Sequence, residues 1–226
     1  MARNKEECSE MVAACKEAGV HLFVAYYRRA QERFLKIKEL LDQKATGDVR
    51  LVSSTQYQKE GDDVKDLDHL PWRVQPEIAG GGLFIDLASH TLDILDFLLG
   101  PIQGAKGFSS NQAGYYDAED IVTGTYQFQS SVHGVGKWCF TAFEDVDMNE
   151  IVGSEGKISF SIFGDDPVIL TTREGQQQWS FERPEHVHQP LVTTIVKELT
   201  DGGGWCPSTG ESGARTNRVM DEIVGK

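Results

Sequence analysis

Seven segments between residues 102 and 182 alternate apolar and polar side chains, the period of a β-strand with one buried face. We predict strands at 102–109, 119–128, 132–142, 147–152, 157–163, 167–172 and 176–182. Short turns such as Ser130-Ser131 and Glu174-Gly175 separate them, so consecutive strands should pair antiparallel. Helical periodicity marks 31–45, 83–99, 189–200 and 209–224. The pattern therefore predicts an α+β fold, an open, mainly antiparallel β-sheet with helices packed on one face.

The first 27 residues follow a different layout. Asn4 can cap a helix over residues 4–18, whose apolar stripe is expected to face a core and comprises Cys8, Met11, Val12 and Cys15. Residues 20–26 are then predicted to form a strand that is buried on both faces. A helix followed by one such strand is half of a parallel β-α-β unit, and this unit has no sheet of its own to join.

Charge and cysteine content exclude several classes of function. The chain has 22 Lys and Arg against 35 Asp and Glu, a formal charge of −13, which argues against nucleic acid and anionic lipid as partners. No apolar run approaches the roughly 20 residues of a membrane-spanning helix, and no secretory signal opens the chain. The four cysteines lack disulfide or metal-ligand spacing, which predicts reduced thiols, a cytoplasmic protein and no metal site.

The helix after Gly80-Gly81-Gly82 carries the strongest candidate for chemistry. Asp86, His90 and Asp93 recur at i, i+4 and i+7 and should share one helix face. A carboxylate one turn before an imidazole can orient it for proton transfer near neutral pH. The alternative is the solvated face of an amphipathic helix, and the spacing by itself leaves both interpretations open.

Two shorter motifs are weaker candidates. Tyr27 and Arg28 follow the predicted strand at 20–26, where open α/β sheets place ligands, although a solvated basic patch explains them equally well. Trp72 and Arg73 lie in a long polar loop over residues 59–79 and could stack on a ligand or pack on each other. His186 and His188 have no third metal ligand nearby, so packing at a helix start is the preferred interpretation.

The open face of the predicted sheet needs a partner. Strands such as 135–140 and 158–163 place large side chains on one face or both, and helices are expected to cover only one of these faces. Solvent, a second domain or a second chain could cover the other. We favour a homo-oligomer formed through the sheet.

Several of these motifs together resemble one family. Residues 80–93 read Gly-Gly-Gly-Leu-Phe-Ile-Asp-Leu-Ala-Ser-His-Thr-Leu-Asp and are similar to the GGG-x-x-x-D-x-x-x-H-x-x-D helix of the Gfo/Idh/MocA oxidoreductases. The resemblance extends, in order, through residues 24–29, 47–49, 71–73 and 206–213. Members of that family are NAD(P)-dependent enzymes that act on sugars, inositols and related polyols.

The resemblance implies an assignment for each part of the chain. Residues 28–226 would be the C-terminal substrate domain, with a dihydrodipicolinate-reductase-like fold, and residues 1–27 the last helix and strand of a Rossmann domain. His90 would be the catalytic acid/base, and Asp86 would orient it and bind the sugar. Substrate contacts would come from Arg28, Trp72, Arg73 and Asp93, and nicotinamide contacts from Tyr27 and Arg28.

The chain departs from the family pattern at its start. The dinucleotide-binding glycines, the acidic residue for the ribose and the family Glu-Lys-Pro motif are absent from it. We therefore expect the C-terminal part of a sugar or polyol oxidoreductase that uses NAD or NADP when complete, and a chain that alone is inactive and binds neither cofactor tightly. The alternative is a non-enzymatic sugar-binding or oligomerisation module. Neither the sugar, the direction of reaction nor the cofactor preference follows from these motifs.

Overall fold

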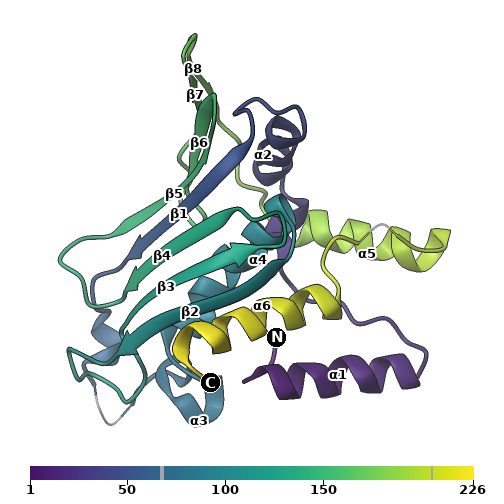
Figure 1. The fold of residues 1–226 in the computed structure, drawn as a ribbon. Helices are drawn as coiled ribbons and strands as arrows, with labels where there is room; N and C mark the ends of the chain where they lie inside the picture. The colour runs from purple at the N-terminus through teal and green to yellow at the C-terminus, as the bar shows by residue number, and fades with distance from the viewer. Residues whose placement is uncertain (67–68, 205) are drawn as a thin grey trace.

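One eight-stranded sheet forms the centre of the molecule (Figure 1). The computed structural model describes residues 1–66, 69–204 and 206–226. The strands are β1 Val49–Tyr57, β2 Ile102–Ser110, β3 Ile121–Phe128, β4 His133–Cys139, β5 Val146–Gly153, β6 Gly156–Phe160, β7 Val168–Thr172 and β8 Gly175–Trp179. All seven strands predicted between residues 102 and 182 are present, and the alternation of buried and exposed side chains is clearest in β3 and β4.

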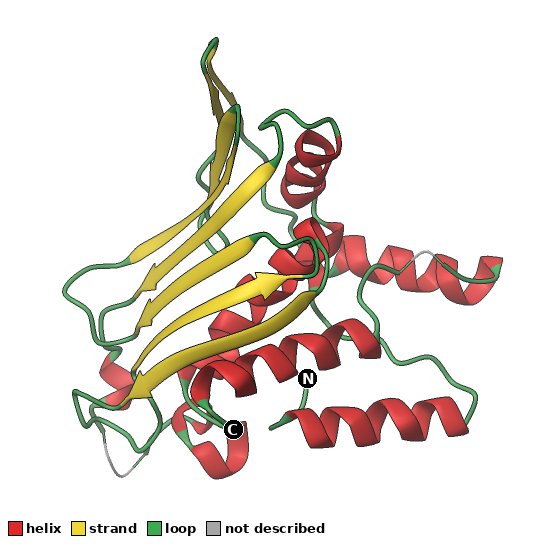
Figure 2. Ribbon diagram, viewed as in Figure 1, coloured by secondary structure: helices red, strands yellow, loops and turns green. Residues whose placement is uncertain are grey.

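The helices gather on one side of this sheet (Figure 2). The α-helices are α1 Lys5–Glu17, α2 Glu32–Asp42, α3 Pro76–Ala79, α4 Ser89–Leu99, α5 Gln189–Asp201 and α6 Gly210–Val224. The short helices are η1 Tyr27–Ala30, η2 Asp62–Val64, η3 Trp72–Val74 and the π-helical η4 Phe84–Ala88. The predicted loop at 59–79 thus contains η2, η3 and α3, and its residues 67–68 lie outside the described residues. The predicted α+β class, with one covered and one open face, is confirmed.

Strand β1 gives the sheet a mixed pattern. The order is β2-β3-β4-β1-β5-β6-β7-β8, with β1 parallel to β4 and antiparallel to β5. The prediction that consecutive strands pair is therefore wrong for β4 and β5, between which β1 lies. A parallel pair needs a long crossover connection, and the segment that contains α4 provides it.

The core lies between the sheet and helices α2, α4 and α6. Trp138 of β4 is fully buried and meets Phe84 edge-on, with ring centroids 5.1 Å apart. Helix α6 lies directly on β2, where a Cβ at Gly107 would come within 2.7 Å of the Ile223 carbonyl oxygen. A glycine is needed at this position for the close approach of helix and strand.

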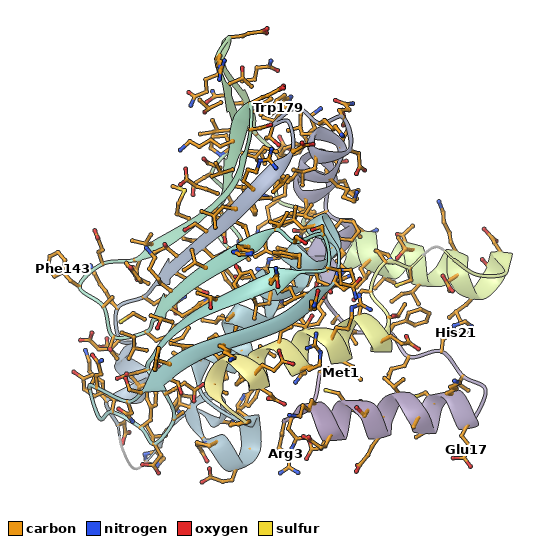
Figure 3. All side chains as sticks on the ribbon, viewed as in Figure 1. Met1, Arg3, Glu17, His21, Phe143 and Trp179 are labelled. Atoms are coloured by element: carbon orange, nitrogen blue, oxygen red, sulfur yellow. The ribbon has the colours of Figure 1, made fainter. Side chains whose placement is uncertain are left out.

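The N-terminal segment differs from its prediction. Residues 20–26 are extended but make only one isolated bridge, between Phe23 and Thr209, because the described residues offer no parallel strand to pair with. Of the predicted apolar stripe only Cys8 is buried, and Met11 is 40% exposed. Helix α1 starts beside α6, near the labelled Met1 and Arg3, and runs out toward Glu17 (Figure 3). It therefore covers α6 rather than the sheet.

None of the helices in the described part of the chain is both long and apolar enough to cross a membrane. All four cysteines are free thiols, as their spacing predicts.

Candidate active site

Three of the predicted site residues line one cavity. Asp86 of η4, His90 of α4 and Trp72 of η3 surround a space of about 420 Å³. Tyr26 and the first three residues of the chain complete its wall. Trp72 and His90 are 18 positions apart in the sequence. The fold brings both to one cavity, because an ion pair between Arg73 and Asp86 joins η3 to η4, which leads into α4.

Asp86 lies in η4, the π-helical turn that leads into α4. Residues Phe84–Ala88 form a wider turn than an α-helix, a feature that is frequent at functional sites. The Asp86 carboxylate pairs with Arg73, at 3.0 Å between Oδ2 and Nε, and Arg73 stacks on Trp72 at 4.8 Å. No hydrogen bond joins Asp86 to His90 in the described residues. The expected orientation of the imidazole by Asp86 is therefore not seen here.

Aromatic rings hold His90 instead. Its ring centroid lies 5.6 Å from that of Tyr26 and 6.0 Å from those of Tyr27 and Phe163. Its Nδ1 is buried without a hydrogen-bond partner among the described residues. Burial lowers the pKa of His90 to about 3, and the positive charges of Arg28 and the chain's amino terminus, together with His188, act in the same direction. At neutral pH the imidazole is therefore uncharged.

The low pKa of His90 predicts a pH dependence of stability. The folded-state value of about 3 lies below the 6.5 of a free imidazole, so the unfolded chain binds the proton more tightly. Stability is therefore complete above pH 6.5 and is lost as the pH falls from 6.5 toward 3. Urea unfolding should show that wild type loses about 2 kcal/mol more than His90→Gln between pH 7 and pH 5. Equal losses in the two proteins would contradict a buried neutral imidazole.

Arg28 and Tyr27, predicted to bind substrate and nicotinamide, lie next to His90. Tyr27 also contacts His188 at 4.5 Å, so the imidazole predicted to pack at a helix start lies at the edge of the site. Phe163 is the residue that the sequence did not single out. It belongs to the connection between β6 and β7, and only its position opposite His90 in the folded chain gives it a role.

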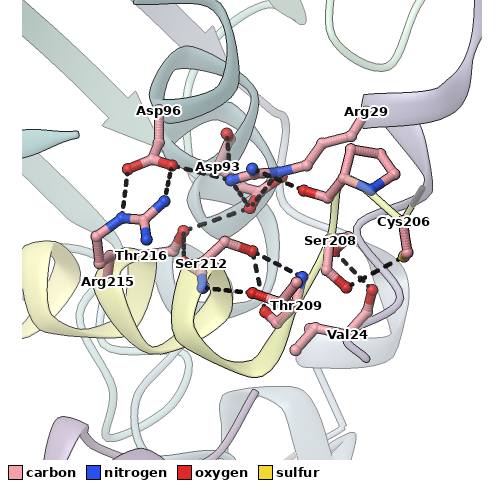
Figure 4. Close-up of polar contacts among 11 residues, drawn as sticks. Val24, Arg29, Asp93, Asp96, Cys206, Ser208, Thr209, Ser212, Arg215 and Thr216 are labelled. Atoms are coloured by element: carbon pink, nitrogen blue, oxygen red, sulfur yellow. Dashed lines mark hydrogen bonds and ion pairs between the residues drawn. The ribbon is translucent and has the colours of Figure 1, made fainter. Parts of the chain in front are cut away.

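Asp93, predicted to contact the substrate, lies elsewhere (Figure 4). It is 1% exposed and accepts two hydrogen bonds from Arg29 Nε, at 3.0 and 2.9 Å, and one from Nη2 at 2.7 Å. Asp96 joins Arg29 to Arg215 of α6, with contacts of 3.1 and 2.7 Å. These four residues form a buried ion cluster that ties η1, α4 and α6 together. Because its helix face turns into this cluster, Asp93 does not line the cavity of His90.

The described residues contain no group of three or more His, Cys, Asp or Glu side chains that could hold a metal ion.

Comparison with known proteins identifies the family. A family model described as the GFO/IDH/MocA C-terminal domain matches residues 34–159, which is more than half of the chain. "Oxidoreductase P35" of Formosa agariphila is 34% identical over 229 residues, which cover 100% of this chain and 69% of that protein. The chain belongs to the GFO/IDH/MocA family.

Other relatives are also oxidoreductases, and a solved structure shares the fold. The chain is 27% identical to the 1,5-anhydro-D-fructose reductase of Ensifer adhaerens, over 94% of this chain and 64% of that protein. The solved structure of a levoglucosan dehydrogenase in complex with NADH and levoglucosan superposes with a TM-score of 0.83 at 22% identity, and the match covers 98% of this chain and 68% of that one. This GFO/IDH/MocA chain thus spans about two thirds of the length of these relatives.

Proposed function

We propose that this chain is the substrate-binding part of an NAD(P)-dependent oxidoreductase acting on a sugar or polyol. The single observation that supports this proposal most is His90, a neutral imidazole at the wall of a cavity of about 420 Å³. An uncharged imidazole with an unpartnered nitrogen is suited to exchange a proton with a hydroxyl group. The family and the enzymes it contains supply the class of reaction.

In the proposed reaction, a bound NAD or NADP would supply the hydride acceptor for the carbon of the substrate that carries the reacting hydroxyl. His90 takes the proton of the hydroxyl on that carbon, and it returns the proton when a carbonyl is reduced. Asp86 and Trp72 hold the rest of the sugar, since both line the cavity and the Asp86 carboxylate, fixed by its pair with Arg73, offers a charged hydrogen-bond acceptor there. Rings of Tyr26, Tyr27 and Phe163 keep the imidazole in place and limit water around it.

The dinucleotide itself does not fit this chain. The described residues form one mainly antiparallel sheet, without a glycine-rich turn between a parallel strand and a helix. We infer that most contacts to NAD or NADP come from residues outside the 226 described by this sequence, and that only Tyr27 and Arg28 reach the nicotinamide from this side.

A chimera tests the proposed function. The part of the Formosa relative that this chain does not match is fused, at the corresponding junction, to residues 1–226. We expect the chimera to reduce NAD or NADP with at least one member of a panel containing D-glucuronate, levoglucosan, myo-inositol and D-xylose. A folded chimera that binds NADH but turns over no member of the panel would favour the non-enzymatic module instead.

The unfused chain is the control for the cofactor. Calorimetric titration with NADH and NADPH is expected to show no binding at millimolar concentrations. Micromolar binding by the 226-residue chain would contradict the inference that other residues hold the dinucleotide.

We also propose that the open sheet face joins two copies of the chain. This face presents Leu51 of β1, 40% exposed, and Met148 of β5, 48% exposed, on neighbouring strands. Light scattering after size exclusion should give at least twice the chain mass of 25.1 kDa. Met148→Glu should reduce it to one chain, because a charge cannot be buried unpaired, whereas Val196→Glu on the exposed helix α5 should not. A monomeric wild-type chain would refute this interface.

A further inference from the structure

Arg28 and Arg29 are adjacent in the sequence and equally buried, but only Arg29 is paired with carboxylates. Each is 4% exposed. Arg29 is neutralised by Asp93 and Asp96, as described above. Arg28 forms no ion pair among the described residues, and the groups that hold it are neutral: Nε donates to the Ile162 carbonyl oxygen at 2.9 Å, and the Tyr27 side chain makes a second hydrogen bond. Its Nη1 is buried without a partner. Arginine is rarely buried unless it is paired, so Arg28 requires an explanation.

The surroundings of Arg28 hold the cation in place without neutralising it. The guanidinium carbon lies 4.7 Å from the Tyr27 ring and 4.6 Å from the Phe163 ring. The negative charge of Asp147 acts on Arg28. The Asp147 carboxylate, however, already accepts hydrogen bonds of 2.6–3.1 Å from the backbone N–H groups of residues 162, 163 and 164. Burial therefore lowers the pKa of Arg28, although a guanidinium of this kind stays charged at neutral pH.

Arg28 lines a second cavity, of about 350 Å³, a size typical of ligand sites. Two more arginines, Arg33 and Arg183, line the same space. Arg33 is held by the carbonyl oxygens of Gly164 and Asp166, and the charge of Arg183 lowers the pKa of both Arg28 and Arg33. The acidic side chains of this lining are exposed to solvent and comprise Glu32, Asp165 and Glu182. The buried wall of the cavity is thus cationic and its rim is mixed.

This cavity lies next to the proposed active site, although the two have no lining residue in common among those described. The Tyr27 and Phe163 rings that enclose Arg28 are the same rings that contact His90. An acidic substituent on a sugar held at His90 would reach Arg28 by extending past these two rings.

We propose that Arg28 binds an acidic group, a carboxylate or phosphate, carried by the sugar substrate. That this ligand is the substrate rests on the proposed function. That it carries an acidic group is inferred from the unpaired buried guanidinium of Arg28. The acceptor oxygens of such a group would satisfy Nη1 and neutralise Arg28 as Asp93 neutralises Arg29. The enzyme would then favour an acid sugar over the neutral sugar of the same shape, because the neutral one leaves the cation unpaired.

Calorimetric titration of the 226-residue chain tests the proposal without any turnover. The probes are D-glucuronate, D-glucose and inorganic phosphate. We expect glucuronate to bind at least about tenfold more tightly than glucose, and Arg28→Met to abolish that difference. The matched control Arg50→Met removes the same charge from an exposed position on β1 and should leave glucuronate binding unchanged.

Three results would overturn the proposal. Equal binding of glucuronate and glucose would show that the acidic group is not recognised. Phosphate that binds as tightly as glucuronate would assign the site to a free anion rather than to the substrate. Arg28→Met that still binds glucuronate more tightly than glucose would show that a residue other than Arg28 recognises the acidic group.

The proposed function can fail independently. An inactive chimera, with glucuronate still bound through Arg28 in the chain, would leave the acidic site intact and refute only the oxidoreductase.

Discussion

His90→Ala in the active chimera is expected to lower kcat by about 10²–10⁴-fold, the usual contribution of a general acid/base. The alanine removes the only imidazole of α4, and the carboxylate of Asp86, which also lines the cavity, is already paired with Arg73. KM should change much less than kcat, since the proton moves in the transition state rather than on binding. Steady-state kinetics with the best sugar of the panel give both values.

The matched control is His21→Ala, which removes an exposed imidazole after α1 that does not line the cavity. Its kcat should equal that of the parent chimera. If His90→Ala kept the parent kcat, His90 would not be the proton acceptor, and the site would need a different residue in that role.

Arg29→Met is expected to lower the free energy of unfolding by about 3–5 kcal/mol, the cost of breaking a buried ion pair by removing one partner. Without Arg29, the Asp93 carboxylate would keep only the Thr216 hydroxyl as a hydrogen-bond donor among the described residues, at 3.5 Å. Asp96 would still pair with Arg215. Urea unfolding followed by circular dichroism, at pH 7, measures the difference.

Arg50→Met is again the control, because it removes a charge of the same kind from an exposed strand position and should change stability by less than about 0.5 kcal/mol. A loss below about 1 kcal/mol for Arg29→Met would mean that the cluster repacks or admits water. Together with Arg28→Met, these variants compare one residue type in paired, unpaired and exposed positions.

Local patterns were sufficient for most of the secondary structure. The alternation between residues 102 and 182 predicted every strand from β2 to β8, and Asn4 does cap its helix, with Oδ1 accepting from the Glu7 N–H at 2.8 Å. These features depend on neighbours a few residues away, so the chain specifies them by itself. The motif on residues 80–93 likewise pointed to His90, which lies at a cavity as expected.

Only the tertiary structure decided which groups meet. Residues 20–26 have a strand-like sequence but form only one isolated bridge, between Phe23 and Thr209. Strand β1 lies in the sheet between β4 and β5. Phe163 reaches His90 from a distant turn, and the π-helical turn directs Asp86 to Arg73. The clearest case is Arg28 and Arg29, adjacent and identical in the sequence. Local chemistry cannot separate them, because the partner that neutralises a buried charge comes from another element of the fold.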